Sequence, residues 1–127
     1  MSDYTHLNLL ETEDDAAKYG IGDTLEAHFA RTQLGCERTG ISLQRIKPDQ
    51  RMFGHTHKED EEIYVVLSGG GTALLGSEER ELRPMDALRL APATLRAFRA
   101  GPEGLELLAF GTHHEDDAVQ RPDAWED

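Results

Sequence analysis

Two histidines separated by a single residue, His55 and His57, are the residues whose types and spacing most directly suggest chemistry. Alternate side chains of an extended strand lie on one face, so both imidazoles reach a common point if this stretch is a strand. On a helix they would diverge by about 200° and could not share an ion. Gly54 before the pair and a charged turn after it argue against a helix. The pair therefore predicts metal ligands, with packed, hydrogen-bonded histidines and no ion as the alternative.

A third ligand is expected from the next segment, "EEIYVVL", which follows the charged turn "KEDE". Glu61 and Glu62 compete for this role, because strand alternation places them on opposite faces. Glu62 shares its face with Tyr64 and Val66, which fits a barrel interior with one polar anchor. Two imidazoles and one carboxylate form a facial set suited to Fe(II), Mn(II), Ni(II) or Zn(II). One such divalent transition metal is therefore the expected cofactor.

The opposite face of the same segment is strongly apolar, since it carries Ile63, Val65 and Leu67. An exposed apolar face of this size needs a cover. The N-terminal arm or a second subunit would provide it, and we therefore expect a homodimer.

An all-β fold is expected to position these residues. Short apolar and β-branched segments recur about every 8 to 12 residues, which is typical of a sandwich or barrel. No long helical pattern interrupts them, which argues against a βαβ architecture. We expect an N-terminal arm over residues 1–23, a barrel over 24–111 and an acidic surface tail over 112–127. Within the barrel, "SGGG" and "AGPEG" are predicted to be turns between separate strands.

Composition limits the setting and the partners of the protein. The 127 residues, 38% hydrophobic and 30% charged, fit one globular domain. The net charge of −12 disfavours nucleic acid and anionic membranes as partners. The single cysteine, Cys36, is expected to be a small core residue, and no apolar run approaches the roughly 20 residues of a membrane span. Without a secretory signal at the N-terminus, a cytoplasmic location is the expectation.

Four residues, His55, His57, Glu62 and Gly69, resemble the first sequence motif of the cupins. That motif is His-x-His, three or four residues, Glu, six residues, Gly. It also has a glycine six residues before the first histidine, where this chain has Asp49. With the strand pattern, the resemblance covers roughly residues 40–111. It implies a single small jelly-roll barrel, often dimeric, with a metal inside.

The second cupin motif is poorly kept. In the best register Met85 stands where the motif has its first glycine, and Arg96 stands where it has the histidine that would be the fourth metal ligand. Arginine has no lone pair to donate, so it cannot ligate a cation. Three arrangements follow: an Arg96–Glu62 ion pair in place of the metal, an Arg96 that binds an anion, or a metal held by three protein ligands and water.

These alternatives lead to different functions. The favoured one is binding of a small acidic molecule in the barrel, with Arg96, Tyr64, Phe98 and Arg45 around the ligand. The other is a mononuclear metalloenzyme of the dioxygenase or isomerase type using His55, His57 and Glu62, as the resemblance implies. A purely structural or regulatory dimer is the third. The sequence leaves open whether the protein is an enzyme.

Overall fold

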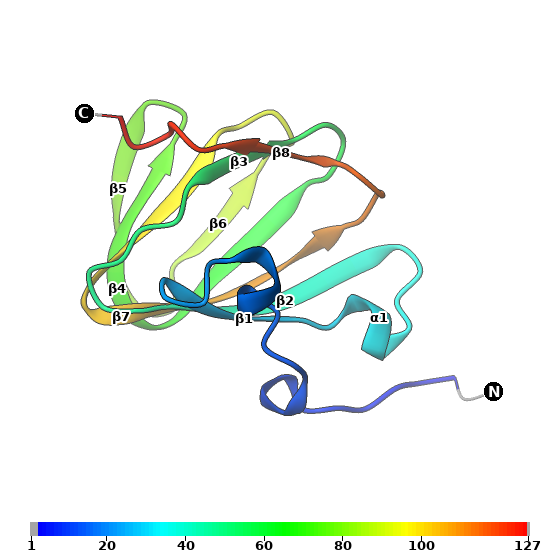
Figure 1. The fold of residues 1–127 in the computed structure, drawn as a ribbon. Helices are drawn as coiled ribbons and strands as arrows, with labels where there is room; N and C mark the ends of the chain where they lie inside the picture. Colours follow the sequence, from blue (N-terminus) through cyan, green and yellow to red (C-terminus); the bar gives the residue numbers. More distant parts are fainter. Residues whose placement is uncertain (1–2, 127) are drawn as a thin grey trace.

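The computed structural model describes residues 3–126, and most of its regular structure is one antiparallel sheet of eight strands (Figure 1). The strands are β1 (Leu25–Phe29), β2 (Thr39–Ile46), β3 (Gly54–His57), β4 (Glu62–Leu75), β5 (Glu78–Leu82), β6 (Ala87–Leu90), β7 (Arg96–Thr112) and β8 (Ala118–Arg121). The helical elements are short: η1 (Leu9–Glu11), η2 (Ala16–Tyr19) and α1 (Arg31–Leu34). The all-β prediction is confirmed.

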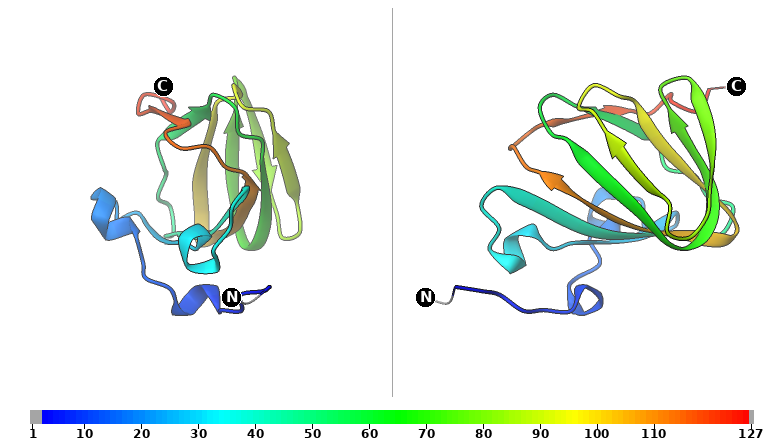
Figure 2. Two further views of the ribbon diagram at one scale, coloured as in Figure 1. Left: turned by 90° about the vertical axis from the view of Figure 1, so that its right-hand side faces the viewer. Right: turned by 180° about the vertical axis from the view of Figure 1, so that it is seen from behind.

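The two longest strands, β4 and β7, pair with each other along nearly their whole length and fold the sheet over on itself. One layer contains β1, β2, the C-terminal part of β7, the N-terminal part of β4, and β6. The other contains β8, β3, the remaining parts of β7 and β4, and β5. The two views of Figure 2 show the resulting half-open barrel. Its apolar core lies between the layers.

The predicted turns at "SGGG" and "AGPEG" are wrong. Both glycine-containing segments lie inside continuous strands, β4 and β7, and the pairing between these strands shifts register on either side of Gly69. Gly69 has a φ of 75°, and a Cβ there would collide with the carbonyl oxygen of Gly104. The glycines therefore do not end the strands. They permit the bulges at which the paired strands pass from one layer to the other.

The core is formed by the alternate side chains that the sequence pattern placed inside the barrel. Tyr64 and Val66 of β4 pack with Phe98 and Leu107 of β7, and all four are at most 2% exposed. The Tyr64 and Phe98 rings lie 4.8 Å apart. Burial of these large apolar groups is the main force that holds the two layers together.

The N-terminal arm runs along the outside of β1. Its second 3-10 helix ends at Gly20, which has a φ of 72°. The carboxylate of Asp14 accepts the backbone N–H of Ala27, and the hydroxyl of Thr12 lies 3.1 Å from the buried imidazole of His28. The arm therefore covers the β1 edge of the layer that contains β1 and β2. Among residues 3–126, no helix is long and apolar enough to cross a membrane.

Two residues that replace motif glycines adopt the left-handed backbone conformation all the same. Asp49 has a φ of 62° and Met85 a φ of 75°. Aspartate tolerates this region because its short side chain bonds locally, whereas methionine gains nothing there. Met85 is 78% exposed, so packing does not compensate for the strain.

We expect Met85→Gly to stabilise the protein by about 0.5–1 kcal/mol. Glycine removes the steric penalty of the left-handed conformation, and the larger chain entropy that it gives the unfolded state cancels only part of this gain. Urea unfolding followed by circular dichroism measures the change. Asp49→Gly serves as the comparison and should give a smaller gain. A destabilised Met85→Gly variant would contradict the strain at this position.

The outer face of β4 and β7 is the surface through which we expect the predicted homodimer to form. Ile63 pairs with Phe110 and Val65 pairs with Leu108 across these strands, and Phe110 is 38% exposed. In solution we expect a dimer that buries this face, and Val65→Glu should convert it to a folded monomer because the new charge would be desolvated at the contact. Light scattering coupled to size exclusion measures the mass, with Ser77→Glu in the β4–β5 turn as the control. A monomeric wild-type protein at micromolar concentration would refute the prediction.

Candidate metal centre

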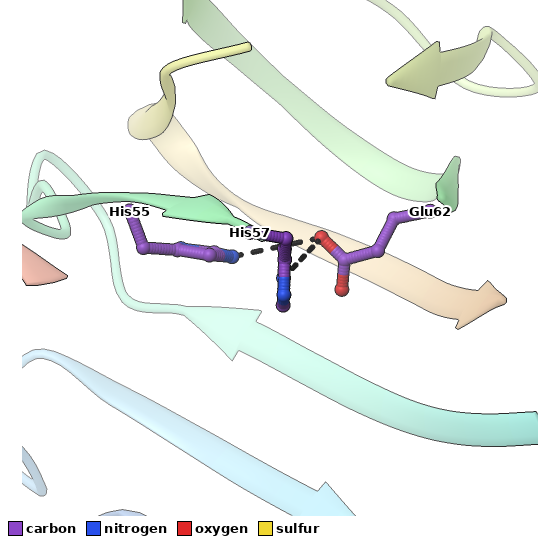
Figure 3. Close-up of side chains that lie close together, drawn as sticks. All are labelled: His55, His57 and Glu62. Carbon is purple, nitrogen blue, oxygen red and sulfur yellow. Dashed lines mark ion pairs between the residues drawn. The ribbon is translucent and has the colours of Figure 1, made fainter. Parts of the chain in front are cut away.

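The two histidines lie on strand β3 and the carboxylate lies at the start of β4, as the spacing predicted. Both imidazoles point toward Glu62 (Figure 3). The Nε2 atoms of His55 and His57 are 3.6 and 3.3 Å from the same oxygen, Oε1 of Glu62. The rings stand nearly at right angles, with centroids 5.0 Å apart. These three residues form the candidate metal centre.

Arg96 is completely buried behind Glu62. Its Nη1 donates to Glu62 Oε1 at 2.7 Å, and its Nη2 donates to the carbonyl oxygens of Ala91, Pro92 and Thr94 at 2.8–3.0 Å. The Nε group donates to Thr94 as well. Of the three arrangements that the sequence left open, the Arg96–Glu62 ion pair is present, but it lies behind Glu62 and not in place of a metal between Glu62 and the histidines. The guanidinium is engaged by protein groups and is not exposed to a ligand in the barrel.

Tyr64 completes the setting of the Glu62 carboxylate. Its hydroxyl donates to Oε1 at 3.1 Å from a fully buried position. Burial and the nearby charge of Glu62 raise the pKa of the Tyr64 hydroxyl well above its ordinary value, so it remains a donor. Phe98 packs against the ring of Tyr64. The sequence predicted both aromatic rings near a ligand, and in the structure they are buried members of the apolar core next to the centre.

Asp117 fixes the ring of His57 from the other side. The Nδ1 atom of His57 is 3.1 Å from Oδ2 of Asp117, and this carboxylate also accepts the backbone N–H groups of Glu59 and Asp60, both at 2.9 Å. Although burial raises the pKa of Asp117, these two backbone bonds and the imidazole lower it below its ordinary value. An ionised carboxylate only accepts hydrogen bonds, so Nδ1 of His57 must carry a proton.

The inner nitrogen of His57, Nε2, has no hydrogen-bond partner within the part of the chain that the structure describes. It is buried, and the acceptor oxygen of Glu62 lies 3.3 Å from it. Burial lowers the pKa of His57, but contact with Glu62 and Asp117 outweighs this effect and raises it. For Glu62, burial raises the pKa, and the contacts with His55 and His57 hold it far below its ordinary value. The centre therefore favours a positive charge between the imidazole and the carboxylate.

The spacing of the three ligands suits a metal ion. Two ligand atoms that are each about 2.1 Å from an ion lie about 3.0 Å apart at a right angle and about 3.4 Å apart in a tetrahedron. The distances of 3.3 and 3.6 Å are close to this range. Glu62 and Asp117 carry two negative charges against the one positive charge of Arg96, so the surroundings attract a divalent cation. The residues present therefore fit a divalent transition metal.

Arg45 does not belong to this centre, contrary to the prediction that it lines the ligand site. Its side chain points away from the barrel interior and donates to Glu106 at 2.6 Å, with Glu26 at 3.6 Å. The strand phase explains the error, because Gln44 and Ile46 on either side of it face the core. Arg45 instead lines an outer cavity of about 460 Å³.

Sequence reasoning missed the contribution of the C-terminal tail, here residues 113–126. Strand β8 pairs with β3, Asp117 is buried behind His57, and Trp125 donates to the carbonyl oxygen of Met52 at 2.7 Å. His114 is half exposed, as expected for the tail, but its Nδ1 lies 2.6 Å from the buried carboxylate of Asp60. Contact with Asp60 raises the pKa of His114. Three consecutive acidic residues, Glu115 to Asp117, gave no signal of which one is buried.

Comparison with known proteins supports the fold. No family model matches the sequence, and no curated protein sequence matches it. Solved structures do match. A cupin protein from Bacteroides fragilis is 23% identical over 91% of this chain and 89% of its own, with a TM-score of 0.73. A sugar phosphate isomerase of the cupin superfamily from Silicibacter pomeroyi is 20% identical over 91% and 81%, with a TM-score of 0.74.

A polyketide cyclase from Streptomyces resistomycificus is also similar, at 15% identity over 91% of this chain and 84% of its own, with a TM-score of 0.76. At these identities the similarity establishes the fold alone. The chain folds as a small cupin-like domain, a double-stranded β-helix, which is the fold that the resemblance of its first motif implied.

Removing the charge of Glu62 should destabilise the protein strongly. In Glu62→Gln the guanidinium of Arg96 stays buried without its counter-ion, and we expect a loss of about 3–5 kcal/mol in the free energy of unfolding. Urea unfolding of metal-free protein measures it. Glu61→Gln is the matched control, because Glu61 is 54% exposed and pairs with Arg89 at the surface. That variant should lose less than about 1 kcal/mol, and an equal loss in both would contradict the role of the buried pair.

The difference in the free energy of unfolding between wild type and Glu62→Gln should depend on pH. Because the folded protein lowers the pKa of Glu62, the carboxylate stabilises the fold fully above its ordinary pKa of about 4.5. This contribution is lost as the pH falls from there toward the lowered pKa. Unfolding measured between about pH 7 and pH 3 should show the gap narrowing only in the acidic part of the range. A gap that widens on acidification would contradict the direction of the shift.

Proposed function

We propose that the protein is a metal-dependent cupin that binds one divalent transition metal ion through His55, His57 and Glu62. One observation carries the proposal: Nε2 of His57 is buried, has no hydrogen-bond partner among residues 3–126, and lies 3.3 Å from the acceptor oxygen of Glu62. A buried nitrogen lone pair that faces a carboxylate oxygen is unfavourable unless a cation lies between them. A proton can serve as this cation, and so can a metal ion that His55 also binds.

The residues around the ligands match what metal centres require. A metal-bound histidine usually donates its outer N–H to a carboxylate, and Asp117 stands in this position behind His57. A metal-bound carboxylate is usually held by hydrogen bonds, and Arg96 and Tyr64 hold Glu62 in this way. These contacts orient two of the three ligands before the metal arrives, which lowers the cost of assembling the site.

Three protein ligands leave positions open for a small molecule. When bound, the metal would supply Lewis-acid polarisation of an oxygen-bearing ligand. Arg96 cannot take a position on the ion, and its bonds to the carbonyl groups of residues 91–94 keep it behind Glu62. Tyr64 and Phe98 close the floor of the barrel and exclude water there. We infer that the open positions face the remaining side of the centre.

The hypothesis of a small acidic ligand remains part of the proposal, with a different anchor. Arg96 was expected to recognise the acid, but its donors are used by Glu62 and by backbone carbonyl oxygens. We propose that a carboxylate or similar oxygen ligand approaches the metal instead. Activity of the isomerase or dioxygenase type is the proposed reaction class, and similarity in fold to a sugar phosphate isomerase supports including isomerisation.

Metal binding is the measurement that tests the proposal. We expect untagged wild-type protein to bind one equivalent of Zn(II) or Mn(II) in a calorimetric titration. His57→Ala should weaken the affinity by more than about 100-fold, because loss of a direct ligand exceeds the usual 10- to 100-fold effect of losing its outer partner. His113→Ala is the control, since His113 lies in the tail outside the centre. Equal affinity in His57→Ala and wild type would refute the site.

A further inference from the structure

We propose that Asp117 is a positioning residue of the metal centre, and that metal binding and docking of the C-terminal tail stabilise each other. The inference rests on the proposed metal function. It assigns to the acidic tail, which the sequence suggested was only a surface segment, a direct part in setting the affinity of the site.

The first observation is the pairing of β3. This strand carries both histidines, yet its ladder with β7 consists of the single pair His55–Arg96. Its ladder with β8 spans all four of its residues, Gly54 to His57. One further backbone bond runs from His57 N–H to the carbonyl oxygen of Pro92 at 2.8 Å. Most of the hydrogen bonding that keeps β3 extended therefore comes from the tail, and the extended form is what brings the two imidazoles together.

The second observation is the clamp formed by Asp117. Its carboxylate accepts the N–H groups of Glu59 and Asp60, so it also closes the loop that leads from β3 to β4. That loop sets the distance between the histidines and Glu62. The same carboxylate accepts from Nδ1 of His57. One buried group therefore fixes both the ring of a ligand and the loop that joins the ligand-bearing strands.

The third observation is that the two carboxylates nearest to Asp117 in this region are engaged elsewhere or exposed. Asp60 Oδ2 is 3.9 Å from Nδ1 of His57, but it accepts from the backbone N–H of His114, and Oδ1 accepts from the side chains of Thr112 and His114. Asp116, one residue earlier, is exposed and has a φ of 53°. Without Asp117 the neutral imidazole of His57 can place its proton on Nε2, the nitrogen that must be free to bind a metal.

Thermodynamic linkage then couples metal binding to docking of the C-terminal tail. If the docked tail raises the affinity for the metal by some factor, the metal must favour the docked tail by the same factor. Loss of an outer carboxylate partner of a metal-bound histidine typically lowers affinity 10- to 100-fold. We expect this range for Asp117.

Asp117→Asn and Asp116→Asn form a matched pair for the test, because both make the same chemical change and asparagine tolerates the left-handed conformation at position 116. Zn(II) affinity should fall 10- to 100-fold in Asp117→Asn and stay unchanged in Asp116→Asn. Nitrogen-15 spectra of metal-free protein, recorded as the pH is raised until the imidazole of His57 is neutral, report its tautomer. Wild type should carry the proton on Nδ1, and Asp117→Asn should shift it toward Nε2.

A third measurement uses only the wild-type chain, so it does not depend on whether Asp117→Asn folds. Zn(II) should slow hydrogen exchange of the β8 amides by the same 10- to 100-fold factor. An Nε2–H tautomer in wild type, unchanged affinity in Asp117→Asn, or β8 exchange that ignores bound Zn(II) would each overturn the inference. If wild type binds no Zn(II) while its tautomer is as expected, the proposed metal function fails and the positioning of His57 by Asp117 stands.

Discussion

The ion pair between Arg96 and Glu62 is the constraint on which the rest of the structure depends. A fully buried guanidinium is tolerated only when its charge and its donors are satisfied, and this one is satisfied by Glu62 and by the carbonyl oxygens of the loop before β7. The pair thereby joins the first residue of β4 in one layer to the first residue of β7 in the other, away from the bulges at which these strands change layer. It also fixes one oxygen of Glu62 next to both imidazoles, so the chemistry of the centre follows from a structural requirement.

The centre itself was largely predictable from the sequence. Two histidines at alternate positions and a carboxylate facing the interior of the next strand follow from strand geometry, and His55, His57 and Glu62 do converge. The Arg96–Glu62 pair followed from the departure of the second motif. The course of the chain around Gly69 was not predictable, because glycine gives the same local signal in a turn and in a bulge. Long-range pairing between β4 and β7 decides between them.

Arg45 and Asp117 show two other limits. The face on which Arg45 lies depends on the register of β2, and a slip of one residue exchanges inside and outside. Asp117 lies in a run of like residues, and only the pairing of β8 with β3 selects it for burial. Both errors concern contacts between segments distant in sequence. Local composition describes the acidic tail correctly and gives no indication that one of its carboxylates completes a buried site.

The tail also resolves a weakness of the barrel. Strand β3 would be an almost unpaired edge next to β7, and such edges open easily or pair with other chains. Pairing with β8 covers it, and Asp117 ties this cover to His57. The centre thus combines a rigid half, Glu62 held by Arg96 in the core, with a half whose order depends on a terminal segment. A site built in this way can gain or lose affinity through the tail while the barrel stays folded, because the buried ion pair does not depend on β8.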